Sequence, residues 1–385
     1  MRVLKLQGKG YRNLKPFELI PQEGVNVIWG NNAQGKTNLL EALWLFTGSK
    51  SFRGSKEQEI LAIGEAFTSI KLDFFARERE QSAEIKLEKK NSEMTQEARK
   101  NIFTDSLPHG VKRENKLNGV DKKSSAALMG EFCAVVFSPD TLSLIKEGPS
   151  ERRKFIDAAI CQVKPLHTKV FLRYHKALKQ RNTILKDIKM STSLYSLLDV
   201  WDEELAKLGA QMIFNRLEYL QRLTKSAKEI YQGISSGKEE ISLKYSLKTT
   251  NFNMQISEIY DIIIKELTVA RKEDVKAGFS TFGPHRDDIE ISINELPART
   301  YGSQGQQRSC VLALKLAEAE LLNEVTGEKP IALLDDVMSE LDTERQDYIL
   351  NKLTGSQVFI SCCDPAPLLR LTEGKTFYLK GGEIS

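Results

Sequence analysis

A short glycine-containing segment carries the residues best suited to chemistry. The segment from Gly30 to Thr37 reads GNNAQGKT and fits the pattern GxxxxGK[ST]. In this pattern the glycines let backbone N–H groups close around a phosphate, and the following helix offers its positive end. We expect Lys36 to bridge the β- and γ-phosphates of ATP as a catalytic residue, and Thr37 to hold Mg²⁺. The predicted nucleotide contacts are Gly30, Asn31, Asn32, Ala33, Gln34, Gly35, Lys36 and Thr37.

An acidic pair follows an apolar run near the C-terminus. The segment from Ile331 to Asp336 reads IALLDD. Open α/β sheets place their ligands at the C-terminal ends of strands. We therefore predict that Asp335 coordinates Mg²⁺, directly or through water, and that Asp336 orients the attacking water as a catalytic general base. Taken alone, two aspartates after an apolar run could also simply begin a loop.

A third motif, SQGQQ, starts at Ser303 and precedes a long amphipathic pattern. Ser303 with Gln306 three residues later fits a capping box. The same residues resemble the signature motif of ABC ATPases, which in that superfamily contacts the ATP of the partner subunit, and both roles can hold at once. The tetrapeptide that ends at Asp342, SELD, resembles the D-loop at the same interface. The further nucleotide contacts implied are Ser303, Gln304, Gly305, Gln306 and Asp342.

The elements around the phosphate loop have the order that such a loop needs. Alternating apolar residues predict short strands within residues 1–28, and the loop follows the second of them directly. A helical pattern begins at Lys36 and ends at Gly48. Residues 66–90 alternate again, as in an antiparallel meander. Residues 88–116 predict a charged, mobile insertion, and Asn118-Gly119 a hairpin turn.

The middle of the chain predicts a separate lobe. From residue 151 to about 228 the pattern is helical, a strand is expected near 241–247 and a helix over 256–271, after which α/β texture returns. The predicted fold is therefore α/β, a P-loop ATPase head of the ABC/SMC type with mixed sheets and a helical second lobe. We expect the head to span 1–150 and 280–385, and the mostly helical lobe 151–279. No sustained heptads indicate a long coiled coil.

The bulk composition is that of an ordinary globular protein. The chain has 385 residues, of which 41% are hydrophobic and 28% charged. No apolar run approaches the ~18 residues of a membrane helix, and the N-terminus lacks a signal-peptide pattern, so we predict a cytoplasmic protein without a membrane partner. The five cysteines contain no CxxC pair and lie in apolar surroundings. We expect buried thiols and neither zinc nor disulfides.

Basic residues gather at the start of the helical lobe, although the whole chain has a formal charge of only +4. Residues 151–190 hold eleven Lys and Arg against three acids, hence 11 − 3 = +8. Such a stripe can neutralise DNA phosphates without reading bases, or it can be a solvated helix face. The predicted DNA contacts are Arg152, Arg153, Lys176, Lys179 and Arg181, with a second, weaker candidate at Lys112, Arg113 and Lys116. His285 lies among acids without a second His at ligand spacing and is interpreted as structural.

Several of these segments together resemble the RecF family of bacterial recombination mediators, a branch of the SMC/ABC-type ATPases. The resemblance covers nearly the whole chain. Besides the phosphate loop, it rests on GYRNL at Gly10, FSPD at Phe137, GPSERR at Gly148, QRN at Gln180, GPHRDD at Gly283, SQGQQR at Ser303 and DDVMSELD at Asp335.

The resemblance implies a function in recombinational repair, replication restart and the SOS response. It implies a protein that dimerises on ATP, binds double-stranded or gapped DNA, hydrolyses ATP slowly with stimulation by DNA, and helps to load RecA together with RecR and RecO. Two positions depart from the wider ABC pattern. Ser138-Pro139-Asp140 stands where a lid Gln is usual, and Ser361-Cys362-Cys363-Asp364 where a His is expected. With an Asp as base in place of the usual Glu, we expect slow turnover.

Three other classes of protein are alternative interpretations of these motifs, and each fits them less well. A transporter's nucleotide-binding subunit has all three ATP motifs, but normally keeps the Gln and the His that are missing here. A small-molecule kinase shares only the phosphate loop. A pure scaffold has no need of Asp335 and Asp336.

Overall fold

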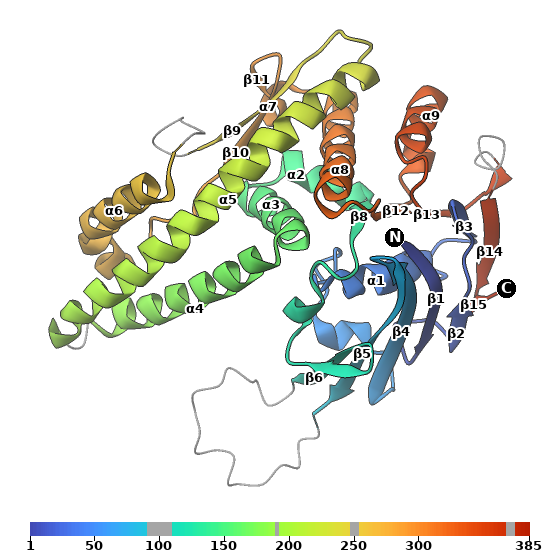
Figure 1. The fold of residues 1–385 in the computed structure, drawn as a ribbon, viewed down its shortest axis with the longest axis horizontal. Helices are drawn as coiled ribbons and strands as arrows, with labels where there is room; N and C mark the ends of the chain where they lie inside the picture. Colours follow the sequence, from blue (N-terminus) through green and yellow to red (C-terminus); the bar gives the residue numbers. More distant parts are fainter. Residues whose placement is uncertain (91–109, 189–191, 247–253, 367–373) are drawn as a thin grey trace. The chain divides into compact units, whose positions relative to one another are not determined.

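The computed structural model describes residues 1–90, 110–188, 192–246, 254–366 and 374–385 (Figure 1). Two compact units make up the chain. Unit 1 comprises Met1–Asp140 and Leu322–Ser385, and unit 2 comprises Thr141–Leu321. Residues 280–321 thus pack with unit 2, although their motifs suggested the ATPase head. The sequence predicts a functional division into a head over 1–150 and 280–385 and a lobe over 151–279. This division stays a prediction, because the two units are defined by packing alone.

A mainly parallel sheet forms the centre of unit 1. Its strand order is β15-β14-β3-β13-β12-β8, and only β15 runs antiparallel to its neighbour. The neighbouring strands β13, β12 and β8 are buried along their whole length, which explains their continuous apolar sequences. The strands are β3 (Val25–Trp29), β8 (Ala134–Phe137), β12 (Ile331–Asp335), β13 (Val358–Cys362), β14 (Gly374–Lys380) and β15 (Glu383–Ile384).

A second, antiparallel sheet packs in the same unit. Its order is β2-β1-β4-β5-β6-β7, and burial along β4 and β5 mostly alternates, with one face in the core. Both sheets share one apolar core with α1 (Lys36–Trp44). The strands are β1 (Arg2–Lys9), β2 (Phe17–Leu19), β4 (Phe67–Ala76), β5 (Arg79–Lys89), β6 (Val111–Leu117) and β7 (Val120–Lys122).

The sequence predictions for unit 1 hold at most positions. The meander over 66–90 is confirmed, and so is the Asn118-Gly119 turn, where both residues have positive φ (52° and 77°). The predicted insertion over 88–116 is too long, because β5 runs to Lys89 and β6 starts at Val111, while residues 91–109 lie outside the described part of the chain. The helix after the phosphate loop continues as the 3₁₀ helix η1 (Leu45–Thr47) and ends at Gly48 with φ 80°.

Unit 1 also contains shorter helical elements. Helix α9 starts after Asp342, whose side chain accepts a hydrogen bond from the amide of Arg345. The remaining elements are η2 (Glu57–Ile60), η4 (Ser125–Leu128), η7 (Met338–Glu340) and α9 (Thr343–Lys352).

Unit 2 is mostly helical, as predicted for this part of the chain. The helices α4, α5 and α6 pack together, and a small antiparallel sheet of order β11-β10-β9 accompanies them. The helices are α2 (Ser143–Lys146), α3 (Pro149–Val163), α4 (Pro165–Asp187), α5 (Leu197–Ile234), α6 (Ile256–Ala277), α7 (Ala298–Tyr301) and α8 (Gln304–Thr326), which runs on into unit 1. The other elements are η5 (Pro139–Leu142), η6 (Thr192–Ser196), β9 (Ile241–Tyr245), β10 (Ile289–Ile293) and β11 (Leu296–Pro297).

Two buried arginines join the helices of unit 2. Arg181 of α4 donates to Asp202 of α5 and Asp274 of α6, each at 2.6 Å, and all three side chains are fully buried. Arg216 of α5 forms a two-pronged contact with Asp157 of α3 at 2.8 Å. Each buried charge is thereby paired, as burial of a charge requires.

Candidate nucleotide site

The loop between β3 and α1 has a backbone that only glycine permits at two points. Gly30 has φ 153°, and a Cβ there would lie 2.2 Å from the carbonyl oxygen of Leu379. Gly35 has φ 111°, and a Cβ there would lie 2.8 Å from Asn13 Oδ1. Gly35 is also the N-cap of α1, and no side chain caps the first N–H groups of this nine-residue helix. Such N–H groups suit an anionic ligand such as phosphate.

Lys36 and Thr37 begin α1 and direct their polar ends toward the loop and the sheet. The Lys36 side chain is buried, and its ammonium donates to the carbonyl oxygens of Gly30 (2.7 Å) and Asn31 (3.0 Å). Thr37 Oγ1 donates to Asp335 Oδ1 at 2.9 Å. The two predicted metal ligands, more than 290 residues apart in the chain, are therefore in direct contact.

The acidic pair lies at the end of β12, beside the end of β13. Asp335 is buried, and Ser361 Oγ donates to its Oδ1 at 2.7 Å. Burial raises the pKa of Asp335, although the hydrogen bonds from Ser361 and Thr37 oppose this shift. Asp336 has φ 55°, and its amide donates to Ser361 Oγ at 3.0 Å. The pair thus presents one buried and one half-buried carboxylate at the edge of the parallel sheet.

These residues fit a magnesium–nucleotide complex by their donor chemistry. A hydroxyl and a carboxylate are oxygen ligands, which Mg²⁺ prefers, and it usually takes few protein ligands beside the phosphates. Thr37 and Asp335 would hold the ion, and Lys36 would hold the phosphates. When bound, the ion would neutralise charge on the β- and γ-phosphate oxygens.

The loop residues between the two glycines are held by groups outside the loop that the sequence did not predict. Asn13 Nδ2 donates to Ala33 O (3.1 Å), and the amide of Gly381 donates to Gln34 Oε1 (2.6 Å). Cys363 Sγ donates to Asn32 Oδ1 at 3.0 Å. Cys363 follows an apolar strand where a His was expected, so the position itself was a signal for a side chain at the phosphate loop.

The GYRNL segment has a structural role beneath the loop. Glu41 of α1 is fully buried and accepts hydrogen bonds from Tyr11 OH (3.0 Å) and from Arg12 Nε (2.9 Å) and Nη2 (2.7 Å). The Ser51 hydroxyl donates to the same carboxylate. This network fixes α1, and with it Lys36 and Thr37, to the segment that follows β1.

The signature-like residues lie in unit 2 at the start of α8. The predicted capping box is confirmed, because the amide of Gln306 donates to Ser303 Oγ (3.2 Å) and the amide of Ser303 donates to Gln306 Oε1 (2.7 Å). Gln306 Nε2 also donates to Glu239 at 2.7 Å. Ser303 and Gln304 are exposed. In unit 1, hydrogen bonding by the amide of Arg345 lowers the pKa of Asp342, the residue of the D-loop-like segment.

Two predicted DNA contacts are corrected by their burial. Arg181 is fully buried in the pairs described above, and Arg152 is buried in a two-pronged contact with Asp288 (2.8 and 2.9 Å). Neither guanidinium can reach a DNA phosphate in the folded unit. Arg153 is half-buried and donates to the carbonyl oxygen of Asp287 at 2.6 Å. The stripe in the sequence mixed these interior residues with surface ones, and only Lys176 and Lys179 of the predicted set are exposed.

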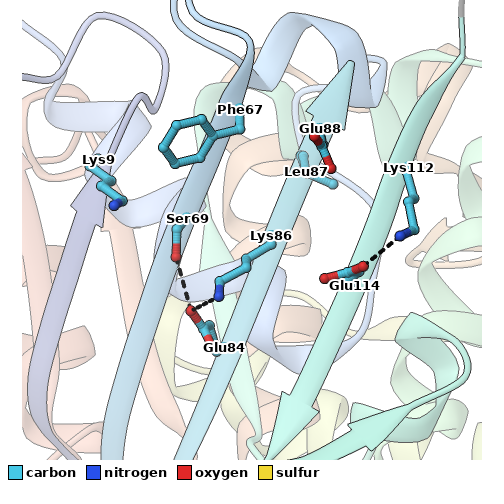
Figure 2. Close-up of a pocket in the computed structure, with 9 residues that line it drawn as sticks. All are labelled: Lys9, Phe67, Ser69, Glu84, Lys86, Leu87, Glu88, Lys112 and Glu114. Atoms are coloured by element: carbon cyan, nitrogen blue, oxygen red, sulfur yellow. Dashed lines mark hydrogen bonds and ion pairs between the residues drawn. The ribbon is translucent and has the colours of Figure 1, made fainter. Parts of the chain in front are cut away.

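The second basic candidate is neutralised by neighbouring acids. Lys112 pairs with Glu114 at 2.7 Å, Arg113 with Glu57 at 3.0 Å and Lys116 with Asp121 at 3.6 Å. A hollow of about 350 Å³ lies beside Lys112 on the outer face of the antiparallel sheet (Figure 2). It is lined by alternating acids and bases, such as Lys86 with Glu84, so it offers no net charge to DNA. It contains none of the predicted nucleotide contacts.

Three further sequence predictions concern single residues. His285 binds its neighbours as a structural residue, with Nδ1 2.7 Å from Tyr174 OH and Nε2 3.2 Å from Ser280 O. All five cysteines are free thiols, but Cys363 is exposed, against the expectation of five buried thiols. Within the described ranges, no helix is both long and apolar enough to span a bilayer.

The fold and the site together define an α/β ATPase-type head of the SMC class. Its features are the parallel sheet with the phosphate loop, the acidic pair at the end of β12 and the mostly helical part of the chain. The family model described as "RecF/RecN/SMC N terminal domain" matches residues 2–373. An SMC head domain bound to ScpA, with 16% identity and a TM-score of 0.55, shares the fold.

Closer relatives narrow the class. A DNA replication and repair protein RecF from Acetivibrio thermocellus is 37% identical over 97% of this chain and 96% of its own length. One from Caldanaerobacter subterraneus is 41% identical over 91% of both chains. The solved structure of the recombination mediator protein RecF-ATP in the RecFOR pathway is 37% identical, with a TM-score of 0.86 over 100% of this chain and 98% of that one. The chain belongs to the RecF family of DNA replication and repair proteins.

Proposed function

We propose that the chain is an ATP-switched DNA-binding protein of recombinational repair and replication restart. The observation that carries the proposal is the contact between Thr37 and Asp335, because it joins the phosphate loop to the acidic pair as a magnesium–nucleotide site needs. The relatives whose structures are described with ATP and with ATPrS support ATP as the nucleotide. Mg²⁺ is proposed from the oxygen donors alone.

Hydrolysis is proposed to be slow and stimulated by DNA, with switching as the main role. Asp336 is the proposed general base, and Lys36 the residue on the transferred phosphate. An aspartate is one methylene shorter than the usual glutamate and holds water farther from the phosphate. A turnover as fast as that of transport ATPases, with or without DNA, would argue against this part of the proposal.

The ATP-bound state is proposed to be a head-to-tail homodimer. Ser303, Gln304, Gly305 and Gln306 begin a capped helix, and such a helix end suits the γ-phosphate of a nucleotide on a second copy. Asp342 is proposed to cross the same interface. Each site is then complete only with both copies.

We propose that DNA lies along the exposed face of α4. Arg173, Lys176 and Lys179 are exposed there, and Lys169 and Lys186 extend the row at both ends. The spacings of three, four and seven residues keep all five on one side of the helix, over about 25 Å. Arg173 also pairs with Glu204. Phosphate contacts of this kind bind duplex or gapped DNA without reading the sequence.

The remaining parts of the proposal rest on the family. They are cooperation with RecR, and with RecO and RecA downstream, and a cytoplasmic location. The relatives' place in the RecFOR pathway supports these partners. A head over 1–150 and 280–385, bearing all the nucleotide motifs, is part of the same proposal.

Sedimentation tests the switch. We expect wild type to dimerise with ATP and Mg²⁺ but not with ADP, and Lys36→Arg and Ser303→Arg to stay monomeric, each with and without duplex DNA. Failure of ATP to produce a dimer of the wild type would refute the proposed head-to-tail homodimer.

DNA binding is tested with charge reversals on α4. Lys169→Glu with Lys176→Glu is expected to weaken duplex binding and to reduce the slope of log K against log[salt] by ~2, because each lost phosphate contact removes about 0.9. Lys265→Glu with Lys272→Glu, two reversals on the exposed surface of α6 in the same unit, is the matched control. Equal loss in both variants would mean that DNA does not bind along α4.

A further inference from the structure

We propose that Ser361 is a positioning residue which holds Asp335 and Asp336 in the arrangement that the bound nucleotide needs. The sequence marked Ser361 only as the first residue of the segment where a His was expected, and gave it no role of its own. The inference rests on the proposed function, in which Thr37 and Asp335 hold the metal ion of a bound nucleotide.

One hydroxyl makes two directional bonds. Ser361 Oγ–H donates to Asp335 Oδ1 at 2.7 Å, and the same oxygen accepts the amide of Asp336 at 3.0 Å. The serine is 1% exposed, so bulk solvent does not compete for these two bonds. A hydroxyl has one proton, so donation to Asp335 leaves its lone pairs for the Asp336 amide.

The first bond orients a metal ligand. Asp335 Oδ1 accepts from both Thr37 and Ser361, which turns that oxygen toward the start of α1 and fixes the carboxylate plane. Without Ser361 only the bond from Thr37 holds the carboxylate, whose last bond is a broad and soft torsion. Coordination of Mg²⁺ then has to order the side chain first, and weakens.

The second bond holds the proposed base. Asp336 has φ 55°, a conformation that L-residues adopt at a cost unless neighbouring groups hold it. Its amide is fixed by Ser361, and its carbonyl oxygen accepts from Ser339 Oγ at 2.9 Å. Loss of the hydrogen bond from the Asp336 amide lets this residue relax to another backbone conformation. Its carboxylate then moves away from the attacking water. Ser361 thereby links the metal ligand and the base through a single atom.

The test combines Ser361→Ala and Ser361→Thr with a matched control. Ser69→Ala removes a hydroxyl that also donates to a carboxylate, Glu84, at 3.1 Å, but on the antiparallel sheet (Figure 2). Binding of a fluorescent ATP analogue is titrated against Mg²⁺, and single-turnover hydrolysis is measured at saturating Mg²⁺. Thermal unfolding of each variant without nucleotide accompanies both.

In Ser361→Ala we expect the Mg²⁺ concentration for half-saturation to rise about tenfold, the size of one hydrogen bond to a charged group. Hydrolysis at saturating Mg²⁺ is expected to fall, while Ser361→Thr and Ser69→Ala behave as wild type. A Ser361→Ala protein with a lowered Tm but an unchanged Mg²⁺ half-saturation would overturn the inference, because the serine would then be only structural. Absence of Mg²⁺-dependent nucleotide binding in the wild type would instead refute the proposed function.

Discussion

Asp336 combines a strained backbone with partial exposure, a combination found at reacting groups. Its neighbour Asp335 is buried and takes two hydroxyl donors, whereas Asp336 is half-buried with a positive φ. Burial therefore distinguishes Asp335, the proposed metal ligand, from Asp336, which is more open to water. The sequence DD distinguishes them only by order.

Replacement of Asp336 by Asn is expected to stop hydrolysis while ATP-driven dimers persist, because the amide keeps the size of the side chain but cannot accept a proton. We expect at least a hundredfold lower single-turnover rate, the low end of general-base effects (~10²–10⁴). Asp347→Asn, an exposed aspartate of α9, is the control. A rate within twofold of wild type would remove Asp336 from the role of base.

His285 is expected to make the stability of unit 2 depend on pH. Burial lowers the pKa of His285 from 6.5 to about 4. Its neutral ring, which accepts from Tyr174 and donates to Ser280 O, is therefore favoured in the folded state. The resulting stability is complete above pH 6.5 and is lost as the pH falls toward 4. The difference in free energy of unfolding between wild type and His285→Gln is expected to shrink by at most ~3 kcal/mol as the pH falls over this range.

Asp287 makes stability depend on pH in the opposite direction over nearly the same pH range, because burial raises its pKa from 3.8 to about 6. Its contribution is lost as the pH rises through 6, so the wild-type profile is shallow, and Asp287→Asn is the informative control. Urea unfolding is followed through Trp201 of unit 2 in a Trp29→Phe, Trp44→Phe background. A difference between wild type and His285→Gln that does not change with pH would show that the ring does not titrate in this range.

Gly35, in the turn that joins β3 to α1, lies close against neighbouring side chains. At Gly35 a Cβ would meet Leu14 Cδ2 at 2.6 Å and Asn13 Oδ1 at 2.8 Å, whereas at Gly24, also with positive φ, nothing lies within 4 Å. Both positions strain an alanine backbone by ~1–2 kcal/mol, but only one also displaces the phosphate loop.

Gly35→Ala is therefore expected to reduce affinity for an ATP analogue by more than tenfold, and Gly24→Ala to lower stability without changing that affinity. Isothermal titration and urea unfolding of both variants separate the two effects. Equal affinities in the two variants would show that crowding at Asn13 does not shape the loop.

The elements were predictable where a local pattern determines them. The strand, loop and helix around Gly30–Thr37 follow from periodicity and glycine spacing, and β12 follows from an apolar run that ends in acids. Ser361 was not predictable, because its role depends on the parallel pairing of β12 with β13, which brings Ser361 opposite Asp335. Arg152 and Arg181 were misassigned for a similar reason. Charge density along a helix does not tell which side of the helix faces Asp288, Asp202 or Asp274.

The two units carry complementary halves of the predicted ATP machinery. Unit 1 holds the phosphate loop and the acidic pair, and unit 2 holds Ser303 at the exposed start of α8. In the proposed head-to-tail dimer each nucleotide would lie between the loop of one copy and the Ser303 of the other. A variant with a defect in one half can then be complemented by mixing it with a variant whose defect lies in the other half.

Lys36→Arg and Ser303→Arg are each expected to be inactive alone, and an equal mixture of the two proteins is expected to recover ATP-dependent dimers and part of the hydrolysis. In a mixed dimer one site combines both defects, but the other pairs an intact loop with an intact Ser303. Because neither variant is expected to dimerise alone, the dimers that form are mixed, each with one working site out of two, so up to about half of the wild-type sites are restored. If Ser303 instead served the nucleotide of its own copy, every site would keep a defect and mixing would restore nothing. Chains that carry both substitutions, mixed with wild type, control for simple dilution. The fraction recovered thus decides whether the site is shared between copies.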